Sequence, residues 1–187
     1  MPLAEGEFGL LPVTEAPPEL LAAFRCGKDH LDHFVVNSVG MHADRLGLTT
    51  VVFHPEVQNA VVGYFTLAND AIPLNTSEQA ELGLHDEVVL TAFPAVKLCR
   101  FAVAQGLQGQ GVGAQILELV MGEILDAESL SAARLVIVDA DNDPPVLRFY
   151  ERHGFERSLW AERQARNHGG RSPPAAIKMI RDILRTL

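Results

Sequence analysis

The sequence predicts a mixed α/β fold in which helices flank a central sheet. Strand-like and helix-like segments alternate along the chain, two strand-like runs are joined by a short loop, and a glycine-rich segment at residues 108–113 links a strand to an apolar helix. The chain has 187 residues, and 48% of them are hydrophobic. It is long enough to bury one core, so a single domain over residues 1–187 with a core at 20–182 is expected.

The first half predicts two helices and an antiparallel strand pair after a start without regular pattern up to Pro18. The helices are expected at residues 20–24 and 29–43, and the second has a group of apolar residues for its inner face: Leu31, Phe34, Val35 and Val39. Strands are expected at residues 48–54 and 60–68. The segment between them contains Pro55 and Asn59 and predicts a hairpin loop.

The second half continues with alternating elements after a polar, proline-interrupted stretch at residues 69–94. A short helix is expected near 77–82, and the whole stretch is either a substrate-facing insertion or an ordinary surface loop. The elements expected after it are a strand at 96–103, the glycine loop, a helix with apolar residues from Ile116 to Leu125, a strand at 134–138, a helix starting at Pro144 or Pro145, and strands near Phe155 and at 176–180.

The glycine loop, Gln-Gly-Gln-Gly-Val-Gly at residues 108–113, has the composition of an anion-binding turn. The first N–H groups of a helix lack partners within the helix, and the helix dipole adds partial positive charge there, so phosphate oxygens bind without a lysine. Glycine accepts positive φ and has no Cβ to hold a ligand away. The segment therefore predicts a phosphate-binding loop.

Three kinds of phosphate loop have patterns that overlap with these residues. A nucleoside-triphosphate loop requires Lys and then Ser or Thr after its last glycine, whereas Ala114 and Gln115 follow here. A dinucleotide loop fits the spacing of Gly109, Gly111 and Ala114, with Asp139 after the next apolar run, but that loop normally follows the first strand directly. A coenzyme A pyrophosphate loop has Gln or Arg, two residues, Gly, one residue, then Gly or Ala, which Gln108, Gly111 and Gly113 satisfy.

With this loop and a second segment, Phe149-Tyr150-Glu151-Arg152-His153-Gly154-Phe155, the chain resembles the GNAT family of N-acetyltransferases. An aromatic residue, Tyr, three residues, Gly and Phe form the closing signature of that family. The two segments stand in the expected order, separated by one helix and one strand. The resemblance implies a mixed, mostly antiparallel sheet with a splayed strand pair that admits acetyl-CoA.

The resemblance also implies which residues bind acetyl-CoA. Backbone groups of Phe101, Ala102 and Val103 would pair with the pantetheine amides, as an added strand pairs with a sheet. The backbone N–H groups of the loop would hold the pyrophosphate; they belong to Gln108, Gly109, Gln110, Gly111, Val112, Gly113 and Ala114.

Tyr150 is the candidate general acid, because the family commonly gives the tyrosine of this signature that role. A phenol has a pKa of about 10, so it is protonated at pH 7 and can donate a proton to a departing thiolate. The alternative is a core aromatic packed beside Phe149. Asp143 stands where many members of the family have asparagine, and Asn142 is offset from that position by one.

The sequence does not identify a general base. His54, His85, His153 and several carboxylates each have the chemistry to act through water, and the alternative for each is a solvated surface group. The two cysteines, Cys26 and Cys99, and the seven histidines lack metal-ligand spacing, so metal-free chemistry is expected. No apolar run reaches about 18 residues and no secretion signal begins the chain, so a cytoplasmic location is expected.

Segments in the first half narrow the resemblance to a subgroup. Residues 24–27 with Leu31 and Phe34, then 63–67, then 93–96, look like the GNAT subgroup that includes toxins of toxin–antitoxin pairs, which acetylate aminoacyl-tRNA. The net charge of −9 disfavours a polyanion on average. From Arg148 to residue 187, however, nine Lys or Arg stand against four Asp or Glu. The arginines at issue are Arg148, Arg152, Arg157, Arg163, Arg166 and Arg171.

Three functions remain open from the sequence. The first is an acetyl-CoA-dependent N-acetyltransferase acting on a primary amine, the second a toxin that acetylates aminoacyl-tRNA and pairs with a small antitoxin protein, and the third an acyl-CoA-binding module without turnover. A homodimer is a further expectation, because members of the family are often dimers.

Overall fold

The computed structural model describes Leu3 and residues 8–84, 90–126, 133–167 and 173–185. The chain divides into two compact units, Met1–Ala68 with Cys99–Glu128 and Asn69–Leu98 with Ser129–Leu187. The described residues form a mostly antiparallel, seven-stranded sheet in the order β1-β2-β3-β4-β5-β7-β6. Two of its strands, β3 (Gly63–Ile72) and β4 (Phe93–Val103), each contribute residues to both units.

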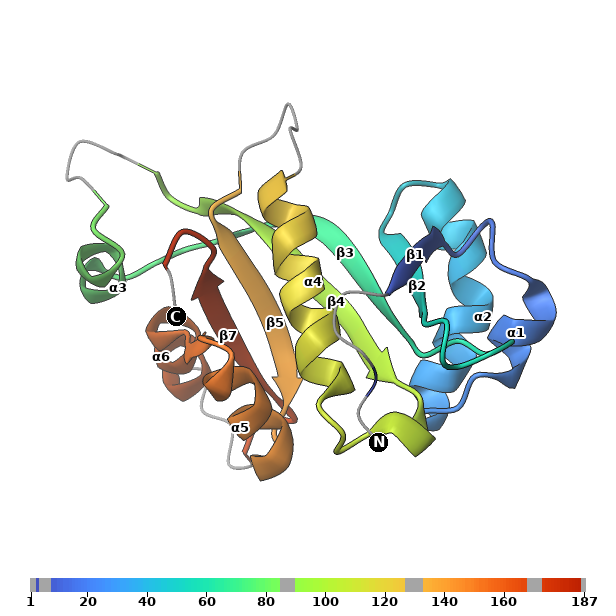
Figure 1. Ribbon diagram of the computed structural model, residues 1–187. Coiled ribbons are helices and arrows are strands. Elements are labelled where there is room, and N and C mark those ends of the chain that lie inside the picture. The colour runs from blue at the N-terminus through green and yellow to red at the C-terminus, as the bar shows by residue number, and fades with distance from the viewer. Residues whose placement is uncertain (1–2, 4–7, 85–89, 127–132, 168–172, 186–187) are drawn as a thin grey trace. The chain divides into compact units, whose positions relative to one another are not determined.

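The first unit contains the predicted strand pair and the predicted helices before it. β1 (Gly9–Pro12) pairs antiparallel with β2 (Leu48–Phe53), which pairs antiparallel with β3. α1 (Pro18–Ala23) and α2 (Asp29–Ala43) pack together beside β1 and β2 (Figure 1). α4 (Val112–Asp126) follows the glycine loop.

An aromatic cluster fixes the start of α2 against the sheet of the first unit. Tyr64 is fully buried, and its ring meets Phe24 edge-on at 5.5 Å and stacks with Phe34 at 6.2 Å. Its hydroxyl donates a hydrogen bond of 2.9 Å to the Leu31 carbonyl. This cluster therefore holds the α1–α2 connection in one place relative to β3.

The second unit is built on a short mixed sheet. β4 pairs parallel with β5 (Leu135–Asp141) from Ala95–Leu135 to Leu98–Val138, and β5 pairs antiparallel with β7 (Ala176–Asp182) over its whole length. The remaining elements of this unit are α3 (Thr76–Glu81), α5 (Pro144–Arg152), β6 (Glu156–Arg157) and α6 (Leu159–Asn167).

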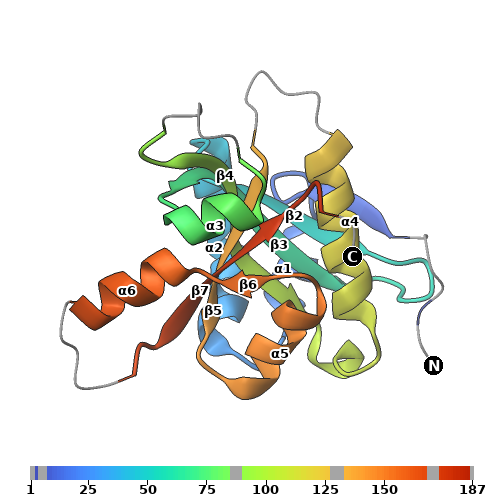
Figure 2. The same cartoon turned by 90° about the vertical axis from the view of Figure 1, so that its left-hand side faces the viewer.

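A single buried carboxylate connects α3 with α6. The side chain of Glu78 is on α3 and is 4% exposed, and one of its oxygens accepts the Asn75 N–H at 2.8 Å in a capping box. The other oxygen accepts the N–H of Leu159 at 2.7 Å, at the first residue of α6. Figure 2 shows α3 beside the start of α6.

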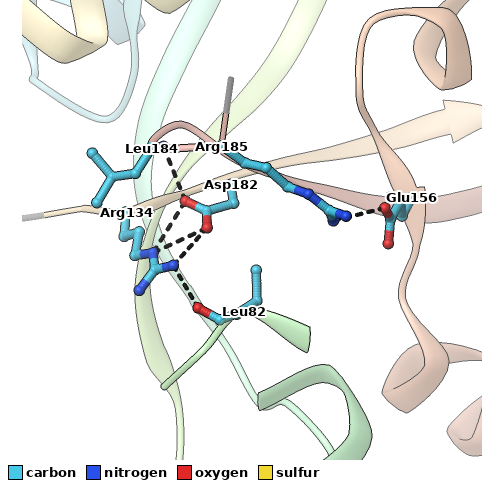
Figure 3. Close-up of polar contacts among 6 residues, drawn as sticks. All are labelled: Leu82, Arg134, Glu156, Asp182, Leu184 and Arg185. Carbon is cyan, nitrogen blue, oxygen red and sulfur yellow. Dashed lines mark hydrogen bonds and ion pairs between the residues drawn. The ribbon is translucent and has the colours of Figure 1, made fainter. Parts of the chain in front are cut away.

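An ion pair joins the residue before β5, the last residue of β7 and the residue after α3 (Figure 3). The Arg134 guanidinium donates to both oxygens of Asp182, at 2.7 to 3.1 Å, and to the carbonyl of Leu82 at 2.6 Å. The carboxylate of Asp182 is 5% exposed and also accepts the Leu184 N–H. Arg185 and Glu156 form a second pair nearby, with both side chains exposed.

Several expected elements need correction. The N-terminal stretch has the strand β1, and a helix, α6, lies at Leu159–Asn167, where none was expected. The polar stretch at 69–94 is shorter than expected, because β3 continues to Ile72 and β4 begins at Phe93. Val39 was expected on the inner face of α2 but is 37% exposed, while Ser38 is buried.

Candidate active site

The glycine loop joins β4 to α4 through one turn of 3-10 helix at Gln105–Leu107. Gly109 and Gly111 have φ of 73° and 85°, in the left-handed region that favours glycine. A Cβ placed on either residue would meet no atom of the described residues within 4 Å. The loop therefore leaves open space beside its backbone, as a bound phosphate group requires.

Backbone donors of the loop are unengaged where the predicted pyrophosphate site lies. The N–H of Gln108 bonds to the Gln105 carbonyl, and that of Ala114 to the Gly111 carbonyl. Between these two residues, none of the N–H groups of residues 109–113 donates a hydrogen bond to a described residue. These five donors and the N-terminus of a 15-residue helix suit an anion.

The side chain of Gln108 holds the loop from within. Its Nε2 donates to the carbonyl of Cys26 at 2.8 Å and to the carbonyl of Val103 at 3.0 Å. The backbone N–H of Gln105 donates to the Arg25 carbonyl at 2.9 Å. The α1–α2 connection thus anchors the glycine loop, a contact between residues about 80 positions apart that no local sequence pattern could have indicated.

The last residues of β4, predicted to pair with pantetheine, lie beyond the ladder with β5. That ladder ends at Leu98, whereas β4 continues to Val103. Ala102 and Val103 are buried and Phe101 is half-buried. A Cβ at Gly63 of β3 would lie 2.7 Å from the Ala102 carbonyl oxygen, so only glycine fits at that position.

Tyr150 lies on α5 in the second unit and is 6% exposed. Its ring packs edge-on against Phe149 at 5.2 Å and Phe155 at 5.3 Å. Burial raises the pKa of the phenol above its ordinary value, and the negative charge of Asp141 raises it further. No described residue forms a hydrogen bond with the hydroxyl. Tyr150 is therefore a protonated phenol whose donor is available.

The other polar candidates have structural contacts. The His54 ring is buried against Phe8 at 5.0 Å, and its Nδ1 accepts the Glu56 N–H. His153 ends α5 with its ring against Phe149. The Asn142 side chain donates to the Pro174 carbonyl at 2.9 Å. His85 lies outside the described residues.

Neither Cys26 nor Cys99 forms a disulfide. Burial raises the pKa of the Cys26 thiol to about 11, and its hydrogen bond with Asp32 adds to the effect. Within the described ranges, no group of three His, Cys, Asp or Glu side chains is arranged to hold a metal ion. None of the described helices is both long enough and apolar enough to span a membrane.

The strand, the open glycine loop and the long helix after it have the geometry that suits a phosphate-bearing ligand. The acetyltransferase (GNAT) domain family matches residues 56–157, more than half of the chain, and the chain belongs to this family. The protein is therefore an acyltransferase. Acetyl-CoA is the co-substrate of this family, and its pyrophosphate is the kind of anion that the loop geometry suits.

Three solved structures of toxin–antitoxin acetyltransferases share the fold. AtaT complexed with acetyl-methionyl-tRNAfMet has a TM-score of 0.69 and 21% identity, over 91% of this chain and 93% of that chain. A tyrosine-to-phenylalanine mutant of KacT has a TM-score of 0.71 and 16% identity, over 95% and 96%. A tyrosine-to-phenylalanine mutant of AtaT bound to the C-terminus of the antitoxin AtaR and acetyl-CoA has a TM-score of 0.64 and 18% identity, over 95% and 94%.

Proposed function

We propose that the protein transfers the acetyl group of acetyl-CoA to the amino group of an aminoacyl-tRNA, as a toxin does. The main support for acetyl-CoA as co-substrate is the open glycine loop, because its N–H groups at residues 109–113 have no hydrogen-bond acceptor among the described residues. The support for aminoacyl-tRNA as the acceptor is the similarity to AtaT, which was solved with acetyl-methionyl-tRNAfMet.

The chain's residues divide the work of binding and proton transfer. The N–H groups from Gly109 to Gly113 hold the pyrophosphate, and the backbone of Phe101, Ala102 and Val103 pairs with the pantetheine amides. Gln108 and Ala114 shape the loop, since their own N–H groups are used within it. In the proposed reaction the amine attacks the thioester carbonyl carbon, the carbon–sulfur bond breaks, and the coenzyme leaves as a thiolate.

Tyr150 supplies the proton that the thiolate takes up. Its environment keeps the phenol neutral at physiological pH, because burial and Asp141 both raise its pKa. The amine must reach the thioester unprotonated, and water in the site can carry its proton away. We assign no side chain as the base.

Exposed arginines of the second unit support a polyanionic acceptor. Arg148 and Arg152 lie four residues apart on α5 and so share a face of that helix, and Arg163 is exposed on α6. None of the three has a carboxylate partner among the described residues. Arg157 and Arg166, in contrast, lie 3.8 Å from Glu151 and 4.0 Å from Glu162. The first three are free to contact tRNA phosphates.

Acetyl transfer from labelled acetyl-CoA tests the proposal directly. The acceptors are a total pool of charged tRNA, the same pool after deacylation, and a panel of small amines. Label on charged tRNA alone is the expected result. Label on a small amine would instead make the protein a metabolic or resistance acetyltransferase, and label on no acceptor would favour an acyl-CoA-binding module without turnover.

A toxin of this kind requires a neutralising partner, and we propose a small antitoxin protein in that role. AtaT, one of the structural relatives, was solved with the C-terminus of the antitoxin AtaR. Co-expression with the product of an adjacent small gene, followed by purification through a tag on one protein, tests this. Recovery of both proteins supports the pairing, and recovery of the tagged protein alone contradicts it.

A further inference from the structure

We propose that Asp32 is a positioning residue for the acetyl-CoA loop, acting through the peptide bond between Arg25 and Cys26 and through Gln108. This inference rests on the proposed binding of acetyl-CoA by the glycine loop. Asp32 lies on α2, in a part of the chain for which neither the sequence nor the family motif assigns a role in binding the co-substrate.

The first step is a short hydrogen bond from α2 to the α1–α2 connection. Oδ1 of Asp32 accepts the backbone N–H of Cys26 at 2.7 Å, and Asp32 is 9% exposed. Gly27, with φ of 86°, lets the chain turn directly after this contact. A buried carboxylate loses its hydration, so a hydrogen bond of this length matters to it more than one at the surface.

The second step follows from the planarity of the peptide group. The Cys26 N–H and the Arg25 carbonyl belong to one trans peptide, so they point in opposite directions. Asp32 accepts from the N–H on one side, and the carbonyl accepts the Gln105 N–H at 2.9 Å on the other. Asp32 therefore fixes the orientation of the carbonyl that holds the first residue of the 3-10 turn.

The third step is the attachment of Gln108 to the next peptide. Its Nε2 donates to the carbonyls of Cys26 and Val103, which uses both amide hydrogens. A shift of the 25–27 connection moves an anchor at each end of residues 105–108, directly before Gly109. If the N–H groups of the loop had to become ordered when the anion binds, that ordering would reduce the affinity. The hydrogen bonds to the 25–27 connection hold these N–H groups in place beforehand, so they preorganise the pyrophosphate site.

Two substitutions at Asp32 distinguish the loss of its hydrogen-bond acceptor from the loss of its negative charge. Asp32→Ala removes the acceptor, and Asp32→Asn keeps an oxygen that can accept the Cys26 N–H. Calorimetry with acetyl-CoA should show dissociation constants about five- to tenfold higher for Asp32→Ala and near wild type for Asp32→Asn. In turnover, the KM for acetyl-CoA should rise with kcat retained.

Ser38→Ala is the matched control. Ser38 is also buried on α2, and its hydroxyl donates to the Val35 carbonyl at 2.9 Å, a bond that does not lead to the loop. The unfolding temperature should fall in Ser38→Ala as in Asp32→Ala, but only Asp32→Ala should lose affinity. Equal affinities for wild type and Asp32→Ala, with a lowered unfolding temperature, would overturn the proposal and leave Asp32 as a stabilising residue.

Combining Asp32→Ala with Gln108→Ala tests the path itself. If Asp32 acts through Gln108 and its neighbours, the dissociation constant of the double variant for acetyl-CoA should be close to the higher of the two single-variant dissociation constants. If the fold-increases in dissociation constant of the two single variants multiplied in the double variant, Asp32 and Gln108 would act independently, which would contradict the proposal. A wild-type protein that does not bind acetyl-CoA would refute the proposed function, an outcome distinct from both.

Discussion

Tyr150 is a packing residue of the second unit and also the general acid that we propose. Its ring fills space between Phe149 and Phe155, and burial keeps its hydroxyl protonated. Tyr150→Phe retains the ring and removes only the donor, so kcat should fall about 10²-fold or more while acetyl-CoA affinity is unchanged. Steady-state kinetics and calorimetry on the same preparation measure the two effects.

Tyr64→Phe is the control for this substitution. Its hydroxyl donates to the Leu31 carbonyl, so the variant should lose about 1 kcal/mol of unfolding free energy and keep its kcat. If Tyr150→Phe turned over at the wild-type rate, the tyrosine would be a packing residue alone.

Among single residues, candidates could be named from the sequence where they stand in motifs, and their roles in the site stay predictions, whereas tertiary contacts could not be predicted. The glycines of the loop and Tyr150 stand in local patterns, because a turn and a helix each constrain residues a few positions apart. Asp32, Gln108 and Glu78 act on residues 6, 82 and 81 positions away. The chemistry of such long-range partners is visible only after the chain has folded.

At the scale of elements, substitutions at Gly111, just before α4, and Gly122, within α4, should have opposite effects on stability. Gly111→Val forces a branched side chain into a backbone with φ of 85° and into the open space of the loop. It should raise the dissociation constant for acetyl-CoA about tenfold and cost about 1–2 kcal/mol of stability. Calorimetry and chemical denaturation measure these quantities.

Gly122→Ala is the matched change within the helix. A Cβ at Gly122 meets no described atom within 4 Å, so alanine should add about 0.5–1 kcal/mol of stability and leave affinity unchanged. Undiminished affinity in Gly111→Val would show that the loop does not contact the pyrophosphate.

The two ion pairs in Figure 3 should differ in strength. Arg134→Ala leaves the buried carboxylate of Asp182 without its guanidinium and should cost about 1.5–3 kcal/mol of unfolding free energy. Arg185→Ala breaks the pair with Glu156, in which the side chains are 63% and 59% exposed, and should cost less than about 1 kcal/mol. Urea denaturation of both variants provides the comparison, and equal losses would contradict it.

The Arg134 effect should also depend on pH. Burial by itself raises the pKa of Asp182, but hydrogen bonds from Arg134 and Leu184 outweigh it and hold the pKa below its ordinary value. The unfolded chain therefore takes up this proton first as the pH falls, at about pH 4. Wild type should therefore lose this stabilisation as the pH falls through the pKa of Asp182, so the stability difference between wild type and Arg134→Ala should be larger at pH 7 than at about pH 3.

The elements expected from the sequence were those with a strong local pattern. The helix expected at 29–43 coincides with α2, because its apolar residues recur at helical spacing. The strand β1 was missed because it has only four residues and ends in proline, and its pairing with β2 supplies the order. α6 was missed because polar and charged residues dominate it, and Glu78 and the Ser158 side chain fix its start.

For the molecule as a whole, the distribution of charge decides whether it can bind a polyanion. The net charge is −9, yet the sequence from Arg148 to residue 187 is basic. Replacing Arg148, Arg152 and Arg163 by alanine should weaken tRNA binding and make the slope of log affinity against log salt less steep by about 2. Filter binding at several salt concentrations measures the slope.

Arg157→Ala is the control for charge, because Arg157 lies 3.8 Å from Glu151. It should change the slope less than any one of the three unpaired arginines. Wild-type binding that does not respond to salt would exclude the arginines as phosphate contacts.

The shared carboxylate of Glu78 restricts how this protein can be re-engineered or can diverge. Because one side chain caps α3 and also receives the first N–H of α6, the two helices form one exchangeable part. Grafting the segment between β3 and β4 from another acetyltransferase without a glutamate at this place would leave a helix 81 residues away with the Ser158 side chain as its remaining cap. Chimeras of this family should therefore exchange both helices together.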